Sequence, residues 1–159
     1  MGSLPHSHKI IIAGNHELIF ERENDLARSL MTNVTYLEDE EVVIDGIKFY
    51  GSPWQPWFYD WAFNLPKGEL LRKKWNLIPE DTDILITHGP PYSILNRNDW
   101  GNEQKGCEEL LKRVMEIKLK VHAFGHIHED YGSKKVDKTL FVNASICTVY
   151  YEPINKPIV

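Results

Sequence analysis

The chain has 159 residues, of which 42% are hydrophobic and 26% are charged, and its formal net charge is −5. This length and apolar fraction suit one packed domain, so we interpret residues 1–159 as a single domain. The negative charge argues against nucleic-acid polymers and anionic membranes as partners, and no apolar run is long enough to span a bilayer. Two widely separated cysteines, Cys107 and Cys147, and the lack of a recognisable signal peptide predict a cytoplasmic protein with free thiols.

The N-terminal third of the sequence predicts short strands around one helix. Residues 9–13 include three consecutive isoleucines, which is typical of a buried strand of a parallel sheet. Residues 21–31 predict a helix whose apolar face contains Leu26, Leu30 and Met31. Strands are expected at 34–37, 41–44 and 47–51, and the Asp45-Gly46 pair between the last two predicts a two-residue hairpin.

Residues 52–64 form an unusually aromatic stretch that also contains two prolines. We expect a loop here, and two interpretations of its aromatic side chains remain open. They can form a satellite hydrophobic cluster that pins the loop to the domain. Alternatively, they can form an aromatic wall at the mouth of a substrate pocket, because nucleotide bases stack on such side chains. The aromatic residues are Trp54, Trp57, Phe58, Tyr59, Trp61 and Phe63.

The rest of the sequence alternates between helical and strand patterns. Helices are predicted at 67–75 and 104–119, the second with an apolar face made of Cys107, Leu110, Leu111, Val114 and Met115. Strands are predicted at 83–87, 121–124, 131–135, 139–143 and 147–151. The loop at 89–103 contains Asp99 and Trp100, which we interpret as an ordinary polar loop or as substrate contacts. This order of elements predicts an α/β fold, a layered β-sandwich flanked by helices, and not an all-β barrel.

Polar groups follow three of the apolar runs, where open α/β sheets place their ligands. They are Gly14-Asn15-His16-Glu17, Thr87-His88-Gly89-Pro90-Pro91 and Gly125-His126-Ile127-His128. Asn15 offers a carbonyl oxygen, and His88, His126 and His128 offer the neutral imidazoles that commonly bind Zn, Fe, Mn and Ni. In a tight turn, His126 and His128 can splay apart and reach two neighbouring ions. The remaining histidines, His6, His8 and His122, we interpret as surface or core residues.

His16 differs from these candidate ligands because it follows Asn15 directly. It can face the substrate, where it would protonate a leaving-group oxygen or stabilise a phosphoryl transition state. Alternatively, it can serve as a second-layer histidine that holds Glu17 or a backbone carbonyl.

The three polar groups, in this order, resemble the last three motifs of the calcineurin-like metallophosphoesterases. Asn143-Ala144-Ser145, with Cys147-Thr148-Val149 and Pro153 after it, is similar to the small metallophosphoesterase-domain proteins of the mammalian brain-expressed type, as is the run from Gly106 to Leu111. The resemblance implies a two-layer β-sandwich with a dinuclear centre of Mn, Fe or Zn at its edge. It implies that Asn15, His88 and His126 bind one ion, that His128 binds the other, and that His16 is catalytic. The two ions would clamp a phosphate and activate a bridging water that attacks phosphorus, with small phosphodiesters, including cyclic nucleotides, as substrates.

The sequence departs from the family pattern at its N-terminus. The family has two earlier motifs, Asp-x-His and Gly-Asp, whereas this chain begins at the Gly-Asn-His-Glu strand and contains no Asp-x-His. The departure implies an N-terminally truncated domain without the bridging Asp, which holds one metal ion or fewer. We expect an exposed sheet edge that could pair two copies into a homo-oligomer. Two functions therefore remain open, a phosphodiesterase or a non-catalytic module with a weak metal- or nucleotide-binding half-site.

Overall fold

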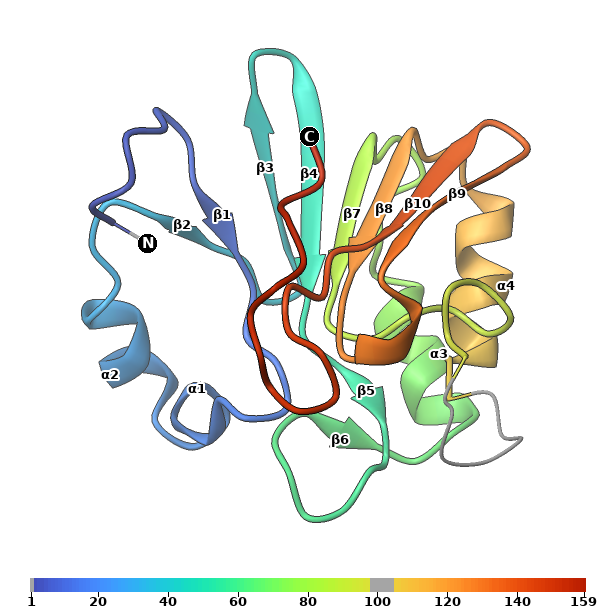
Figure 1. Ribbon diagram of the computed structural model, residues 1–159, viewed down its shortest axis with the longest axis horizontal. Coiled ribbons are helices and arrows are strands. Elements are labelled where there is room, and N and C mark those ends of the chain that lie inside the picture. Colours follow the sequence, from blue (N-terminus) through green and yellow to red (C-terminus); the bar gives the residue numbers. More distant parts are fainter. Residues whose placement is uncertain (1, 98–104) are drawn as a thin grey trace.

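The computed structural model describes residues 2–97 and 105–159, and within them the main element is a six-stranded mixed sheet (Figure 1). Four neighbouring strands run parallel, and an antiparallel strand lies at each edge. In spatial order the strands are β3 (Glu40–Ile44), β4 (Ile47–Ser52), β7 (Ile84–Thr87), β8 (Val121–Phe124), β10 (Thr139–Asn143) and β9 (Gly132–Val136). Because β4, β7, β8 and β10 are parallel, the loops after their carboxyl ends gather at one edge of the sheet.

The main hydrophobic core lies between this sheet and two helices, α3 (Glu69–Trp75) and α4 (Glu108–Glu116). Strand register places Tyr50, Leu85, His122 and Phe141 in one row across four strands, and all four are buried. Side chains alternate along a strand, so this row marks the covered face of the sheet. The helices contribute Leu71, Trp75, Leu110 and Val114 to the same cluster. The predicted helix at 67–75 and the strands at 83–87, 121–124 and 139–143 are confirmed.

A second layer begins with β1 (Ile10–Ile11) and β2 (Thr35–Tyr36), which pair in parallel. It approaches the large sheet at Gly51, where an added Cβ atom would lie 2.5 Å from Cβ of Leu37 and 2.7 Å from Cγ2 of Ile12. The expected mixed α/β architecture is confirmed. The strand predicted at 9–13 is shorter than expected, and its three isoleucines are half-buried and not fully buried.

The hairpin predicted at Asp45-Gly46 is confirmed, because Ile44 pairs with Ile47 across it. The φ angles of Asp45 and Gly46 are 52° and 78°. Two consecutive positive φ angles are those of the type I′ turn, whose twist matches that of the two flanking strands.

The single helix predicted at 21–31 is wrong. The chain forms two short helices, α1 (Leu18–Arg22) and α2 (Asn24–Ser29), separated by Glu23 with φ −133° and ψ 55°. Its predicted apolar face is wrong at two of three residues, because Leu26 is 52% exposed and Leu30 is 60% exposed, whereas Met31 packs against a buried cluster. Phe20 and Ala27 are buried instead. The break at Glu23 turns the second helix, so one helical period does not describe both segments.

The helix predicted at 104–119 is confirmed in part. It begins after Cys107, whose Sγ accepts a hydrogen bond from the backbone N–H of Leu110. Leu110 and Val114 are buried as predicted, whereas Met115 is 52% exposed. Gln104 lies outside the described residues, as do Asp99 and Trp100 of the predicted loop.

The strand predicted at 147–151 is wrong, because these residues form a closed turn. The backbone N–H of Thr148 donates to the carbonyl of Glu152 at 2.9 Å, and that of Tyr151 donates to the carbonyl of Thr148 at 2.9 Å. Oγ1 of Thr148 also accepts from the N–H groups of Tyr150 and Glu152. The threonine side chain thus satisfies backbone groups that a strand would have paired. The C-terminal segment that contains this turn runs in front of the sheet in the view of Figure 1.

The aromatic stretch contains two short strands, β5 (Gln55–Pro56) and β6 (Asn64–Leu65), joined by a loop. Trp54 and Phe63 contact edge to face with ring centroids 5.5 Å apart, and both pack against a second small core. That core also contains Ala13, Phe20, Ala27, Tyr36 and Ala62. No helix within the described residues has both the length and the apolar character needed to cross a bilayer.

Candidate metal centre

The five residues predicted from the three motifs lie around one cavity of about 540 Å³. Asn15 and His16 follow β1, His88 follows β7, and His126 and His128 follow β8. The two parallel strands β7 and β8 are neighbours in the sheet, which brings their loops together. The backbone N–H of Gly125 donates to the carbonyl of His88 at 2.9 Å and ties these loops directly to each other.

Three atoms that could bind a metal ion lie close together in the lining of this cavity. Nε2 of His88 lies 2.8 Å from Oδ1 of Asn15 and 3.0 Å from Nδ1 of His126. An amide oxygen only accepts, so Nε2 of His88 carries a proton and donates it to Oδ1 of Asn15, and Nδ1 of His126 lies within hydrogen-bond distance of the same nitrogen. A cation in place of that proton would have two imidazole nitrogens and one amide oxygen as ligands. Nitrogen ligands lie about 2.1 Å from a bound Zn ion, so two that are 3.0 Å apart suit neighbouring positions around one cation.

Burial keeps both of these imidazoles neutral. Loss of hydration, together with the smaller effect of the neighbouring histidines, lowers the pKa of His88 to about 3 and that of His126 to about 4. Because only a neutral imidazole binds a metal, this pair is ready for a cation at neutral pH without first losing protons.

His128 has a different partner. Its Nδ1 lies 2.9 Å from the carbonyl oxygen of Thr148, and its ring contacts Tyr151 edge to face at 5.5 Å. A carbonyl oxygen only accepts, so Nδ1 carries a proton, and Nε2 is the nitrogen left to face a metal ion. This is the usual arrangement of a metal-binding histidine, whose second nitrogen donates to a backbone carbonyl.

His16 is exposed and packs on Trp61, with ring centroids 4.1 Å apart. Its neighbour Glu17 turns back and accepts a hydrogen bond from the N–H of Gly14 at 2.7 Å. That contact leaves Glu17 to a backbone group, which disfavours the interpretation that His16 holds Glu17. The imidazole of His16 lines the cavity and is exposed to solvent.

The described residues supply one set of ligands and not two. Within residues 2–97 and 105–159, no group of three or more His, Cys, Asp or Glu side chains is placed to hold a metal ion. The set of Asn15, His88 and His126 fits one divalent cation by its chemistry, and His128 lines the same cavity with one further nitrogen to offer. The donors on these residues therefore fit half of a dinuclear centre.

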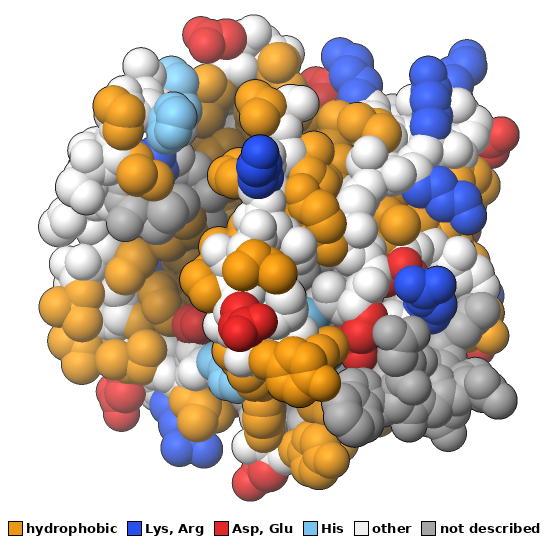
Figure 2. All heavy atoms as spheres, in the orientation of Figure 1, with side chains coloured by type: hydrophobic (Ala, Val, Ile, Leu, Met, Phe, Trp, Pro, Cys, Tyr) orange, Lys and Arg blue, Asp and Glu red, His pale blue; other side chains and the backbone are white. Residues whose placement is uncertain are grey.

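Both interpretations of the aromatic stretch apply, each to different residues. Trp54 and Phe63 pack into the core, whereas Trp57, Phe58 and Trp61 line the cavity. Phe58 also meets His126 edge to face at 5.7 Å. Figure 2 shows histidine atoms beside hydrophobic side chains near the lower centre of this face. The aromatic loop is thus both a structural cluster and a wall of the cavity.

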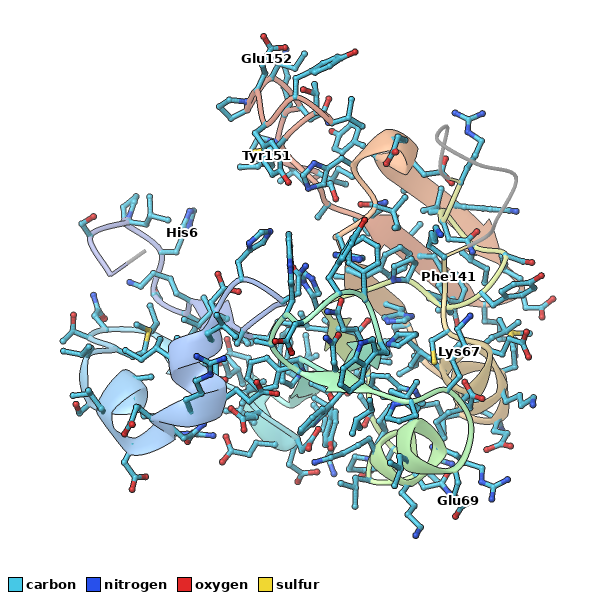
Figure 3. All side chains as sticks on the ribbon, turned by 90° about the horizontal axis from the view of Figure 1, so that it is seen from below. His6, Lys67, Glu69, Phe141, Tyr151 and Glu152 are labelled. Carbon is cyan, nitrogen blue, oxygen red and sulfur yellow. The ribbon has the colours of Figure 1, made fainter. Side chains whose placement is uncertain are left out.

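Several residues at the cavity were missed by sequence reasoning. Lys67 and Tyr151 line it, and Figure 3 shows Tyr151 beside Glu152 on the C-terminal segment. The prediction of a strand at 147–151 hid Tyr151. Asn143 does not line the cavity but supports the loop of His126. The sequence feature that could have indicated this role is a polar residue at the end of an apolar strand.

The three histidines interpreted as surface or core residues lie where expected. His6 and His8 are exposed, and Figure 3 shows His6 on the N-terminal segment, on the opposite side of the molecule from Lys67. His122 is fully buried, and its Nε2 lies 2.8 Å from Oγ1 of Thr87. Cys107 and Cys147 are free thiols, as predicted.

Comparisons with known proteins agree with one another. The model of the family described as calcineurin-like phosphoesterase matches residues 2–130. The human Metallophosphoesterase domain-containing protein 1 is 49% identical over 183 aligned residues, which span 100% of this chain and 56% of that protein. The UPF0046 protein T07D4.2 of Caenorhabditis elegans is 37% identical over 191 residues, covering 100% of this chain and 48% of its own length. The chain spans about half the length of the curated relatives that it matches.

Solved structures share the fold at low sequence identity. The protein TT1561 of Thermus thermophilus has a TM-score of 0.53 at 14% identity, over 86% of this chain and 62% of that one. Another crystal structure has a TM-score of 0.62 at 18% identity, over 86% of this chain and 56% of that one. These likenesses concern the fold alone.

Proposed function

This chain belongs to the calcineurin-like phosphoesterase family, and we propose that it hydrolyses small phosphodiesters in a metal-dependent reaction. The observation that carries the proposal is the convergence of Asn15, His88 and His126, where Nε2 of His88 lies 2.8 Å from Oδ1 of Asn15 and 3.0 Å from Nδ1 of His126, in the lining of one cavity.

Asn15, His88 and His126 would hold a divalent cation, which when bound stabilises charge on a phosphoryl group and acidifies a water molecule. His128 adds its Nε2 to the same cavity, with Nδ1 held by Thr148. The low pKa values of His88 and His126 keep both rings unprotonated, so neither repels a cation nor consumes a proton in the reaction.

His16 would act as the general acid. It is exposed at the cavity, where it can protonate the leaving-group oxygen of a bound phosphodiester. Trp61 supports its ring from one side, which limits the orientations that the imidazole can take. A general acid with fewer orientations loses less entropy when it is aligned for proton transfer.

The aromatic wall supports a substrate with a planar organic group, such as a cyclic nucleotide. Trp57, Phe58, Trp61 and Tyr151 line the cavity that contains His16 and the candidate ligands. Stacking on aromatic side chains contributes about 1–3 kcal/mol per base in nucleic-acid complexes, so such a wall would favour nucleotides over simple phosphates.

The alternative is a non-catalytic module that binds a metal ion or a nucleotide weakly. One observation favours it: within the described residues, no cluster of three His, Cys, Asp or Glu side chains is placed to hold a metal ion. A single cation without a second ion beside it would bind phosphate but would activate water less effectively.

The deciding experiment measures metal content and hydrolysis on the same preparations. Protein is loaded with Mn²⁺, analysed for metal per chain and assayed with bis(4-nitrophenyl) phosphate and 2′,3′-cyclic AMP. We expect His16→Ala to lower kcat for 2′,3′-cyclic AMP about 100-fold or more while metal content is kept, since general acids contribute that much when the leaving group is an alkoxide. His88→Ala should lose the metal, and His8→Ala, at an exposed distant site, is the matched control. Metal uptake without hydrolysis in the unmodified chain would favour the non-catalytic module.

Three further features stay predictions of this proposal. They are the preference for Mn over Fe or Zn, the cytoplasmic location, and a homo-oligomer paired through an exposed sheet edge. Metal selectivity in the loading experiment and the mass of the protein in solution test the first and the last of them.

A further inference from the structure

His126 has a backbone conformation that residues other than glycine rarely adopt. Its φ angle is 69°, and the N–H of Ile127 donates to the carbonyl of Gly125 at 2.8 Å. A hydrogen bond between residues i and i+2 around a positive φ is the mark of a γ-turn of the rare and strained kind. Such strain persists only where surrounding contacts fix the backbone on both sides.

The residues before and after His126, Gly125 and Ile127, are each held from outside the turn. On one side, the N–H of Gly125 donates to the carbonyl of His88 at 2.9 Å. On the other, the carbonyl of Ile127 accepts from Nδ2 of Asn143 at 2.7 Å. The first contact links two candidate ligand loops. The second comes from a residue that has no part in the cavity itself.

The Asn143 side chain is unusually well fixed for this purpose. It is fully buried at the end of β10, where Asn143 pairs with Phe124 of β8. Nδ2 also donates to the carbonyl of Leu95 at 3.3 Å, and Oδ1 accepts from the N–H of Ser145 at 3.1 Å. With three backbone partners, the amide has one orientation, and that orientation places its N–H on the turn of His126.

We propose that Asn143 is a positioning residue that holds His126 in its strained turn and so aims Nδ1 of His126 at Nε2 of His88. The inference rests on the proposed function, because it takes His126 as a metal ligand. Without the Asn143 contact, the carbonyl of Ile127 is free to rotate, and the turn can relax to a negative φ. That relaxation would swing the imidazole away from the point where the three donor atoms meet.

The test compares Asn143→Leu with Thr139→Val. Both variants remove buried hydrogen bonds from a side chain on β10 to backbone, but Oγ1 of Thr139 donates to the carbonyl of Leu119, at the end of β10 away from the cavity. Two readouts are taken on each folded protein. One is the affinity and visible absorption spectrum of Co²⁺, and the other is hydrogen exchange of the Ile127 amide, with the Leu140 amide as internal reference.

We expect Asn143→Leu to weaken Co²⁺ binding at least about tenfold, to alter the Co²⁺ spectrum and to speed exchange at Ile127 but not at Leu140, since supporting groups of metal ligands have effects of about 10–100-fold. Thr139→Val should match the unmodified protein in Co²⁺ affinity and spectrum. If Asn143→Leu does not fold, Asn143→Ser, which loses less packing, decides by the same criteria.

Unchanged Co²⁺ binding and unchanged Ile127 exchange in the Asn143 variants overturn the inference. Equal loosening at Ile127 and Leu140 also overturns it, because Asn143 would then stabilise the fold in general. If the unmodified chain takes up no Co²⁺, the proposed function fails, and exchange at Ile127 alone decides whether Asn143 holds the turn.

Discussion

A Cβ atom on Gly14 would lie 2.5 Å from Nδ1 of His88 and 2.6 Å from its Cε1. The imidazole of His88 therefore packs directly on the backbone of the loop that carries Asn15. Only glycine leaves this room, and the close approach is what lets Nε2 of His88 reach Oδ1 of Asn15 at 2.8 Å.

Gly14→Ala should expel the His88 ring from its place. The clash is with a ring held in a buried position, and overpacking of this kind costs about 1–3 kcal/mol of stability. We expect a lower unfolding midpoint in urea and a loss of Mn²⁺ uptake. Gly89→Ala is the matched control, because Gly89 flanks His88 from the other side and the atom nearest to its added Cβ, Cδ2 of His126, is 4.0 Å away. Full metal uptake in the Gly14 variant would mean that the ring position is unimportant.

His126→Gly should be more stable than His126→Ala. Both remove the imidazole, but only glycine adopts a φ of 69° without a steric penalty, which for other residues is about 1 kcal/mol. The measurement is the free energy of unfolding of the two variants, from urea titrations under identical conditions. At most other positions alanine is the more stable choice, so an advantage for alanine here would show that the turn has no strain in solution.

The buried His122 should make stability depend on pH. Burial lowers its pKa from 6.5 to about 3, so between these values the unfolded chain binds a proton that the folded chain does not. Stability from this residue is complete above pH 6.5 and falls on acidification toward pH 3, by at most about 1.4 kcal/mol per pH unit. His122→Gln keeps an N–H for Thr87 and cannot titrate. We expect the unfolding free energy of this variant to fall less steeply on acidification, as followed by urea titrations across the same pH range. Parallel slopes for the two proteins would contradict the assignment.

Trp61→Leu should lower kcat more than it raises KM, because the contact at 4.1 Å orients His16 and not the substrate alone. Trp61→Phe keeps an aromatic ring and should recover most of the rate. Proton chemical shifts of the His16 imidazole give a second readout, since ring currents of the indole act on it at this distance. Imidazole shifts that are equal in the unmodified protein and in Trp61→Leu would show that the two rings are not in contact.

Local sequence predicted the elements whose stabilising contacts are themselves local. The hairpin predicted at Asp45-Gly46 is confirmed because these two residue types favour the positive φ angles of the turn without help from distant contacts. Strands β7 and β8 are correct because their apolar runs are short, continuous and followed by polar residues. The helix predicted at 21–31 is wrong because Phe20 and Ala27 face a core to which distant segments, including the aromatic loop, contribute, and no local pattern reveals that core. The strand predicted at 147–151 is wrong because the Thr148 side chain accepts two backbone hydrogen bonds that stabilise a turn, and hydrophobic periodicity does not reveal such contacts.

The order of residues along the chain was enough to select the candidate site residues, which the structure places around one cavity. Asn15, His16, His88, His126 and His128 follow apolar strands, and parallel strands deliver the loops after them to one edge of a sheet. How these residues meet depended on the folded molecule. Folding brought the ligand atoms of Asn15, His88 and His126 together. It also turned His128 toward Thr148 and divided the aromatic stretch between core and cavity. It also brought Asn143 under the turn of His126. Strand periodicity sets direction and order along the chain, whereas distances between loops depend on sheet register and on contacts between residues far apart in sequence.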